Sequence, residues 1–202
     1  MRRNEFSIEE QEEIRSFLEQ QSFGYLGTVG EDGAPEITPL NYVYVEDHLY
    51  FHGSKVGQKM ANLRSEKRVS FAVAEEVALI PSYFTDPHFA CPATAFFKSV
   101  LIKGEARVLE DPERKAQVLS AFMKKLQPEG GYDPFSLEDP GYVSRIKAVA
   151  VVEIAVHELT AKFKFGQNLD QAKHEHIRQK LQERGLPGDE EAARLMAHFR
   201  KA

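Results

Sequence analysis

The sequence has very little cysteine: Cys91 is the single one among 202 residues. One cysteine excludes an internal disulfide and a cysteine-based metal cage, and it fits a reducing compartment. Long apolar runs are also absent, since no stretch approaches the roughly 20 apolar residues of a transmembrane helix. The basic residues near the N-terminus are followed by polar ones rather than by the apolar core of a signal peptide. These absences predict a cytoplasmic protein without a membrane partner.

The chain also lacks an excess of basic residues. Its formal net charge is −5, whereas proteins that bind nucleic acid generally present a basic face. No nucleic-acid partner is therefore expected, although a local basic pocket for one anionic ligand remains compatible with this charge. There is no internal repeat, and the length suits one well-buried core. We expect one domain over residues 1–169 and a helical extension over residues 170–202 that packs on it.

Apolar alternation and turn residues predict a mainly β chain with peripheral helices (β+α). Ser7 to Glu10 has the form of a capping box that opens a helix ending near Gln21. Few helices separate the predicted strands, which favours a closed or nearly closed antiparallel barrel over a doubly wound fold. The expected strands are 23–29, 34–45, 48–52, 69–73, 77–84, 95–109 and 147–157, and the other helices are 58–65, one starting at Pro112, 170–184 and 189–201.

The first unusual segment is Thr38-Pro39-Leu40-Asn41, inside the expected strand 34–45. Proline cannot donate to a sheet ladder, so Pro39 must lie at an edge, a bulge or a bend. Such a break has two interpretations. It is a structural bulge, or it leaves backbone groups free to contact a ligand.

The second segment runs from Phe51 to Lys59, with the sequence Phe-His-Gly-Ser-Lys-Val-Gly-Gln-Lys. A strand passes into two glycines, a hydroxyl and two lysines just before a predicted helix. Free amides at a helix start, a hydroxyl and an ammonium are what a phosphate group requires. The spacing is not that of a Walker motif, which disfavours a nucleotide triphosphatase. A solvated turn is the alternative interpretation.

The third segment is Lys162-Phe163-Lys164-Phe165-Gly166-Gln167-Asn168, after the last expected strand. It reads either as an amphipathic edge strand or as a source of cations and amides for an anionic or planar ligand. The histidines predict no metal site. His48 and His52 lie roughly 13 Å apart on a strand, and a pair of histidines two residues apart on a helix points to different faces.

Together these segments resemble one family. The sequence shows, in order, Phe23-Gly-Tyr-Leu-Gly-Thr-Val, Asp32-Gly-Ala-Pro35, Thr38-Pro-Leu-Asn41, Leu49-Tyr-Phe-His-Gly-Ser54, Gly57-Gln-Lys59, Leu63-Arg64, Arg68-Val-Ser-Phe71 and Phe97-Lys-Ser-Val100. This order is similar to that of FMN-binding split-barrel proteins related to pyridoxamine 5'-phosphate oxidase, and in particular to the nitroimidazole-resistance group. The segment from Lys162 to Asn168 resembles the C-terminal signature of a regulator branch of the same fold.

The resemblance implies a six-stranded antiparallel split β-barrel that forms a homodimer, with an FMN in each of two clefts between subunits. His52, Ser54 and Lys59 would hold the phosphate, and Lys98 and Ser99 would approach from the partner subunit. Lysine stands at position 98 where the family more often has arginine, and the basic substrate-phosphate site of the true oxidases is not found. The cofactor-binding residues implied are Thr38, Pro39, Leu40, Asn41, Phe51, His52, Gly53, Ser54, Gly57, Gln58, Lys59, Lys98 and Ser99.

The resemblance also implies a function, a flavoprotein oxidoreductase acting on a small molecule, with an electron donor such as NAD(P)H. No protein acid or base is singled out as catalytic. The alternative is a regulatory or sensor protein that binds flavin without turnover. Haem handling is a third possibility within the fold, although no histidine stands in a context that marks an axial ligand. The sequence does not distinguish FMN from another flavin or a deazaflavin.

Overall fold

The computed structural model describes residues 3–200, which divide into two compact units. The barrel unit consists of Gln11–Val73 and Leu101–Leu159. The terminal unit consists of the residues up to Glu10, Ala74–Val100 and the residues from Thr160 onward. Three long strands contribute to both units, and each unit is described by itself below.

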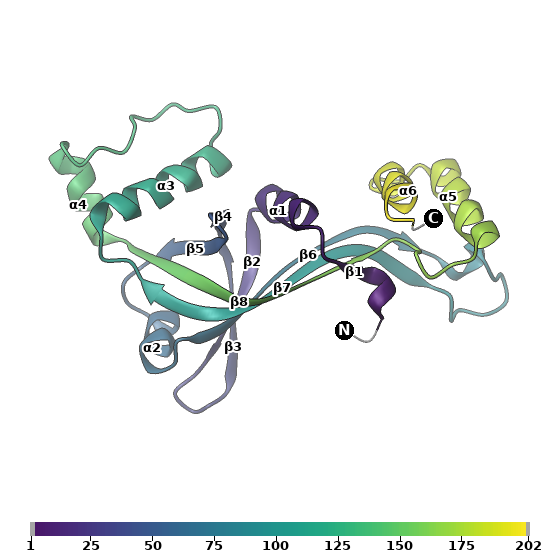
Figure 1. Cartoon of the computed structure of the whole chain (residues 1–202), viewed down its shortest axis with the longest axis horizontal. Coiled ribbons are helices and arrows are strands. Elements are labelled where there is room, and N and C mark those ends of the chain that lie inside the picture. Colours follow the sequence, from purple (N-terminus) through teal and green to yellow (C-terminus); the bar gives the residue numbers. More distant parts are fainter. Residues whose placement is uncertain (1–2, 201–202) are drawn as a thin grey trace. The chain divides into compact units, whose positions relative to one another are not determined.

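The described residues form eight strands and six α-helices (Figure 1). The strands are β1 Ser7–Ile8, β2 Phe23–Val29, β3 Pro35–Asn41, β4 Val43–Val45, β5 His48–Gly53, β6 Arg68–Ile80, β7 Thr94–Val108 and β8 Ala150–Lys164. The helices are α1 Gln11–Gln20, α2 Gln58–Ser65, α3 Pro112–Leu126, α4 Pro140–Ala148, α5 Gln171–Arg184 and α6 Asp189–His198. None of the helices within residues 3–200 is long and apolar enough to cross a membrane.

The predicted fold class is confirmed. The strands form one antiparallel sheet in the order β3-β2-β6-β7-β8-β5-β4, and β1 pairs with β8. The resemblance implied six strands, and the difference lies in β1 and β4, which are two and three residues long. In the barrel unit β3 also contacts β5, so the sheet curls back on itself.

Two tight turns set the register of the first strands. Gly30 donates to the carbonyl of Ala34 over 2.8 Å, and Gly33 has a φ of 80°. Glu46 and Asp47 both have positive φ, 51° and 61°, which is the backbone twist of a two-residue hairpin. The hairpins then align Val29 with Pro35 and Val45 with His48.

Helices α3 and α4 cover one face of the barrel unit (Figure 1). As predicted, α3 begins at Pro112, and the Asp111 carboxylate accepts from the amides of Glu113 and Arg114. The apolar face of α3 packs on β5 and β8 in a cluster that includes Tyr50, Val118, Phe122, Ile146 and Val151.

In the terminal unit, α5 and α6 lie side by side (Figure 1) and close an aromatic core. Phe163 of β8 and Phe165, directly after that strand, both contact the ring of Phe199. Arg184, at the end of α5, pairs with the buried Asp189 and also donates to the carbonyl of Leu79 over 2.9 Å.

Two expectations for the N-terminal half were wrong. Ser7 does not cap a helix: Ser7 and Ile8 form β1 opposite Lys162 and Ala161, and the helix begins at Gln11. The expected strand 34–45 is divided at Tyr42 into β3 and β4, where the backbone amide of Tyr42 donates to the carbonyl of Ser22, which precedes β2, over 3.3 Å. The buried Tyr42 hydroxyl donates to the carbonyl of Leu18 over 2.9 Å.

Three further differences concern longer elements. The expected strands 69–73 and 77–84 are one strand, β6, followed by a short 3₁₀ turn at Ser82–Phe84. A helix, α4, follows the Pro- and Gly-rich stretch and is capped by Asp139. The last strand extends to Lys164, so Lys162 to Lys164 lie within β8 between β7 and β1, not on an edge strand.

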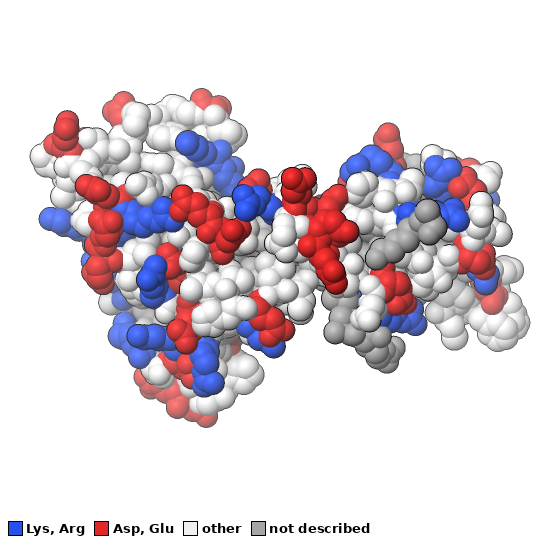
Figure 2. Space-filling view, viewed as in Figure 1, with Lys and Arg blue, Asp and Glu red and all other residues white. Residues whose placement is uncertain are grey.

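Charges on the molecule are mixed. Lysine and arginine side chains alternate with aspartate and glutamate over the visible face (Figure 2). A surface of this kind gives local rather than molecule-wide electrostatic attraction.

Candidate functional site

The loop between β5 and α2 forms a cradle of backbone amides. Gly57 precedes α2 with φ 108° and ψ 172°, a conformation that L side chains rarely adopt. No side chain caps α2, and its first turn holds no acidic residue. The first amides of a helix have no partner within the helix and attract anions. The cradle therefore offers N–H donors to an anion, and the phosphate site predicted from the sequence stays a prediction.

Basic side chains converge on this cradle. The half-buried Lys59 places its Nζ 5.0 Å from the centre of the Phe51 ring. Gly53 lies beside the same group: a Cβ added to it would lie 3.5 Å from Nζ, an ordinary van der Waals distance. Burial lowers the pKa of Lys59. The pKa of His52 is lowered, mainly by burial and then by the charge of Lys59. The centres of the His52 and Phe122 rings lie 4.5 Å apart in an edge-to-face arrangement.

A further lysine behind the cradle was not predicted from the sequence. Lys115 on α3 is only 6% exposed and donates to the carbonyl of Val149 over 2.8 Å. Its pKa is lowered by burial and then by the charge of Lys55, which places these two cations near one another. Among residues 3–200, neither Lys59, Lys55 nor Lys115 forms an ion pair with a carboxylate. A bound anion would therefore relieve repulsion between these cations.

The start of α2 is fixed to the barrel by a second residue that the sequence did not single out. Asn62 is fully buried, and its Nδ2 donates to Thr28 Oγ1 over 3.0 Å and to Glu36 Oε2 over 2.9 Å. Gln58, a predicted cofactor residue, donates to Asn62 Oδ1 over 3.0 Å. Gln58 thus orients the cradle through a side-chain network. Sequence periodicity alone does not indicate that this asparagine inside a helix is buried.

The segment Thr38 to Asn41 lies on β3, at one end of the strand order. Pro39 faces Tyr25 of β2, and the missing proline donor is tolerated at this edge position. Leu40 is buried, whereas Asn41 is exposed and its Nδ2 donates to the carbonyl of Ser22 over 2.9 Å. Pro39 therefore lies at a sheet edge, one of the positions that the sequence allowed, and not at a bulge, since the register of β2 and β3 is continuous there. Contact of this edge strand with a ligand stays a prediction.

Lys98 and Ser99 belong to the terminal unit, whereas the other predicted cofactor residues belong to the barrel unit. Lys98 Nζ lies 3.8 Å from Glu191 Oε1, and Ser99 Oγ donates to the carbonyl of Lys162 over 3.4 Å. Because these two residues and the cradle belong to different units, no unit by itself contains both.

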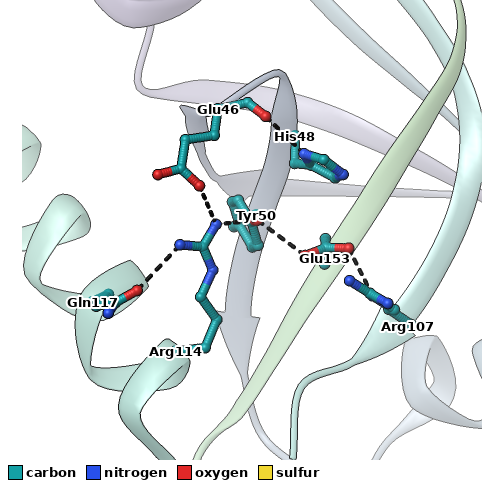
Figure 3. A network of polar contacts seen from close by, with 7 residues as sticks. All are labelled: Glu46, His48, Tyr50, Arg107, Arg114, Gln117 and Glu153. Atoms are coloured by element: carbon teal, nitrogen blue, oxygen red, sulfur yellow. Dashed lines mark hydrogen bonds and ion pairs between the residues drawn. The ribbon is translucent and has the colours of Figure 1, made fainter. Parts of the chain in front are cut away.

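A polar network fixes the strand that leads into the cradle (Figure 3). The Tyr50 hydroxyl donates to Glu153 Oε2 over 3.0 Å and accepts from Arg114 Nη2 over 2.8 Å. Arg107 pairs with the other oxygen of Glu153 at 2.7 Å, and Arg114 pairs with Glu46 at 2.8 Å. Because these charges satisfy one another, the network holds β5, β8 and α3 together and so positions His52.

The pKa values in this network agree with that role. Burial raises the pKa of Tyr50, although the hydrogen bond from Arg114 acts to lower it. Burial also acts to raise the pKa of Glu153, but hydrogen bonds from Arg107 and Tyr50 and the Arg107 charge outweigh it and leave that pKa lowered. Glu153 is 3% exposed and stays an anion in its pairs. Groups of three or more potential metal ligands are absent from the described part of the chain.

Comparison with known proteins identifies what this arrangement is similar to. Residues 10–163 match the family model for pyridoxamine 5'-phosphate oxidase. A curated relative from Bacillus subtilis (strain 168), "Protease synthase and sporulation protein PAI 2", is 25% identical over 95% of this chain and 93% of its own length.

Solved structures agree with the family model. A protein from Bacteroides thetaiotaomicron assigned to 5-nitroimidazole antibiotic resistance is 25% identical, with a TM-score of 0.62 over 77% of this chain and 85% of that one. The FAD and heme binding protein from Mycobacterium smegmatis is 15% identical, with a TM-score of 0.65 over 79% of this chain and 73% of that one. At that identity the second likeness concerns the fold alone.

Proposed function

Because the chain belongs to the pyridoxamine 5'-phosphate oxidase family, we propose that it binds FMN at the α2 cradle and serves as an oxidoreductase of a small molecule. The observation that carries the proposal is the cradle itself, with uncapped helix amides, the glycine at position 57 and lysines that have no carboxylate partner among the described residues. These groups supply the positive charge and the N–H donors that a dianionic phosphate requires.

Each part of the cradle has a role in this proposal. Lys59 and His52 pair with the phosphate, the Ser54 hydroxyl and the first amides of α2 donate to it, and Phe51 supports the Lys59 ammonium. The open edge of β3 at Thr38 to Asn41 offers backbone groups to the polar edge of the flavin ring. FMN supplies the redox chemistry, and the protein supplies binding, orientation and electrostatics.

We further propose a homodimer in which Lys98 and Ser99 reach the cleft of the other subunit. Exposed apolar side chains on β2 and β3 support this assembly: Phe23 is 48%, Tyr25 46% and Ile37 71% exposed. Phe23 and Tyr25 alternate with buried residues along β2, so they stand on one face of the hairpin. Contiguous apolar surface of this kind commonly marks an interface.

The test compares two ligands that differ only in the phosphate. Lys59→Ala should weaken FMN binding by about 1.5–3 kcal/mol, since a charge-assisted contact is lost. Riboflavin, which lacks the phosphate, should bind both proteins equally. Titration of apoprotein followed by flavin fluorescence measures both affinities.

The matched control is Lys67→Ala, which removes an exposed lysine just after α2 and should leave both affinities unchanged. An equal loss of FMN and riboflavin affinity in Lys59→Ala would remove Lys59 from the phosphate site and with it the main support for the proposal.

The second candidate function is flavin binding without turnover. The observation that favours it is the likeness, over nearly the whole chain, to the Bacillus subtilis protein whose name refers to sporulation. The two functions differ in one assay. Anaerobic bleaching of the bound flavin by NADH or NADPH, followed by recovery on adding a nitroaromatic or quinone, supports the oxidoreductase. A flavin that stays oxidised with either donor supports the sensor.

A further inference from the structure

The terminal unit contains a pocket of about 540 Å³ that shares no residue with the proposed flavin site. Its apolar lining includes Ile80 of β6, Phe96 of β7, Ile177 of α5 and, in the turn before α5, Leu169. Ile80, Phe96 and Ile177 are almost completely buried, so neighbouring side chains hold these three in place. A molecule that enters the pocket therefore meets a fixed apolar surface on one side.

The pocket is also lined by two cations. Lys164, at the end of β8, and Arg3 both line it. The ammonium of Lys164 donates to Thr94 Oγ1, which also lines the pocket. Among residues 3–200, no carboxylate forms an ion pair with either Lys164 or Arg3. The two cations thus face the pocket without an anion of the described chain to neutralise them.

The other charged residues of the pocket are already engaged. Lys173 lies 3.3 Å from Asp170, whose carboxylate also caps α5. Asp86 accepts the amides of His88 and Phe89, and these bonds lower the pKa of its carboxyl. The charge of Lys164 is the one that its surroundings disfavour: burial, followed by the charges of Lys162 and Arg3, lowers its pKa. A bound anion would relieve both the burial cost and the repulsion.

We propose that this pocket binds a small organic anion, with its acidic group on Lys164 and Arg3 and its apolar body against Ile80, Phe96 and Ile177. The apolar wall disfavours free inorganic anions, which gain nothing from apolar contact. The cations disfavour neutral apolar molecules, because the ammonium would lose solvent without gaining a partner. Few precisely placed polar groups on a mainly apolar wall are typical of ligand pockets.

The probes are three naphthalenes that differ only in the head group: 2-naphthoate, 2-naphthyl phosphate and 2-naphthalenemethanol. Calorimetric titration of the full chain, loaded with flavin, should show binding of both anions and binding of the alcohol weaker by about tenfold or more. The stronger of the two anions identifies the head group, and either order supports the proposal. Equal binding of the alcohol, or no binding of any probe, overturns it.

Variants locate the site. Lys164→Met should weaken the anions by about tenfold, and Lys164→Arg should restore most of the affinity because the charge returns. Lys180→Met removes a lysine of the same unit that pairs with Glu183 outside the pocket, and it should change nothing. Ala93→Trp fills an exposed lining position and should abolish binding without affecting folding.

Cys91 provides a readout that does not depend on activity. It is exposed, lines the pocket and is the single cysteine of the chain. Alkylation of Cys91 by iodoacetamide, followed by mass spectrometry, should slow severalfold when 2-naphthoate is bound, and the slowing should disappear in Lys164→Met. An unchanged alkylation rate at saturating naphthoate contradicts the assignment.

The outcome is separable from that of the flavin proposal. Lys164→Met should leave FMN affinity unchanged, whereas Lys59→Ala should leave naphthoate affinity unchanged. If Lys164→Met weakens FMN as much as naphthoate, the pocket is part of the flavin site and the inference of a separate anion site fails.

Discussion

Individual ionisable residues in this chain are placed where burial opposes their charge. Lys59 and Lys164 each have a lowered pKa because of burial, and each lies in a different candidate binding site. Burial lowers the pKa of a third lysine, Lys125, to about 8. Its ammonium donates to the carbonyl of Leu18 and lies 4.4 Å from the centre of the Tyr42 ring. Lys125 thus has its partners away from both candidate sites, whereas Lys164 lines a pocket and Lys59 lies at the α2 cradle.

His174 gives a prediction at this scale. It is buried, its Nε2 contacts the carbonyl of Met196 at 3.1 Å, and its Nδ1 has no partner among residues 3–200. Burial, against the Met196 carbonyl, lowers the pKa of His174, with smaller effects of Arg200, Glu175 and Arg178. The folded protein therefore keeps this ring neutral at a pH where the unfolded chain takes up a proton.

The sign of the effect follows from linkage. Below the ordinary histidine pKa, near 6.5, the unfolded state binds the extra proton, so the free energy of unfolding falls as the pH falls. We expect a lower Tm at pH 5.5 than at pH 7.5, and a smaller difference in His174→Gln, measured by circular dichroism. His52, whose pKa is also lowered, accounts for part of what remains. An identical pH dependence in His174→Gln would mean that His174 is solvated in solution.

At the scale of elements, close approach of strands leaves little room for substitution. A Cβ on Gly104 of β7 would lie 2.1 Å from the carbonyl oxygen of Ala155 on β8. Since the obstacle is backbone, the strands must move apart to admit it. Gly104→Ala should lower the free energy of unfolding by about 1–3 kcal/mol, the usual cost of overpacking.

The matched control for Gly104→Ala is Gly27→Ala on β2. A Cβ there lies 3.5 Å from the Ser70 carbonyl oxygen, an ordinary contact. Urea denaturation of the two variants should show a clear loss of stability for Gly104→Ala and a much smaller change for Gly27→Ala. Equal losses would indicate a general cost of removing glycine from these strands.

The same scale shows what the sequence can predict. Elements bounded by local signals were found at their observed bounds: β2 ends at a glycine turn, and α2 begins after Gly57. Elements decided by distant partners were not. Ser7 has the local pattern of a helix cap, yet its backbone pairs with Lys162. Helix α4 follows a proline-rich stretch and is stabilised by the packing of Ile146 in the cluster around Tyr50.

The candidate site divides in the same way. Gly57 and Lys59 carry their chemistry in a short segment, so the cradle was predictable. Asn62 and Lys115 were not, because their roles depend on burial against β2, β3 and α4, which the alternation of residues does not encode. The cofactor roles of the predicted residues stay predictions.

At the scale of the whole molecule, the prediction concerns assembly. Ile37 is the most exposed of the apolar residues on the β2–β3 hairpin. Ile37→Glu should convert the proposed dimer to a monomer, because a buried unpaired carboxylate at an interface is costly. Light scattering after size-exclusion chromatography measures the mass, and Leu126→Glu, an exposed apolar position on α3, is the control. If the cleft is shared, FMN affinity should fall together with the dimer; a monomer that keeps its FMN affinity would separate the two.

The pairing of β1 with β8 has a consequence for folding during protein synthesis. Ser7 leaves the ribosome about 155 residues before its partner Lys162, since 162 − 7 = 155. At about 5–20 residues per second, β1 waits roughly 8–30 seconds for its partner. The terminal unit, assembled from three separate stretches, is likewise completed only after the last of them has been translated. A chain released before the third stretch is made keeps unpaired strand edges, which favour aggregation and degradation, so quality control during synthesis acts on this fold until that stretch is complete.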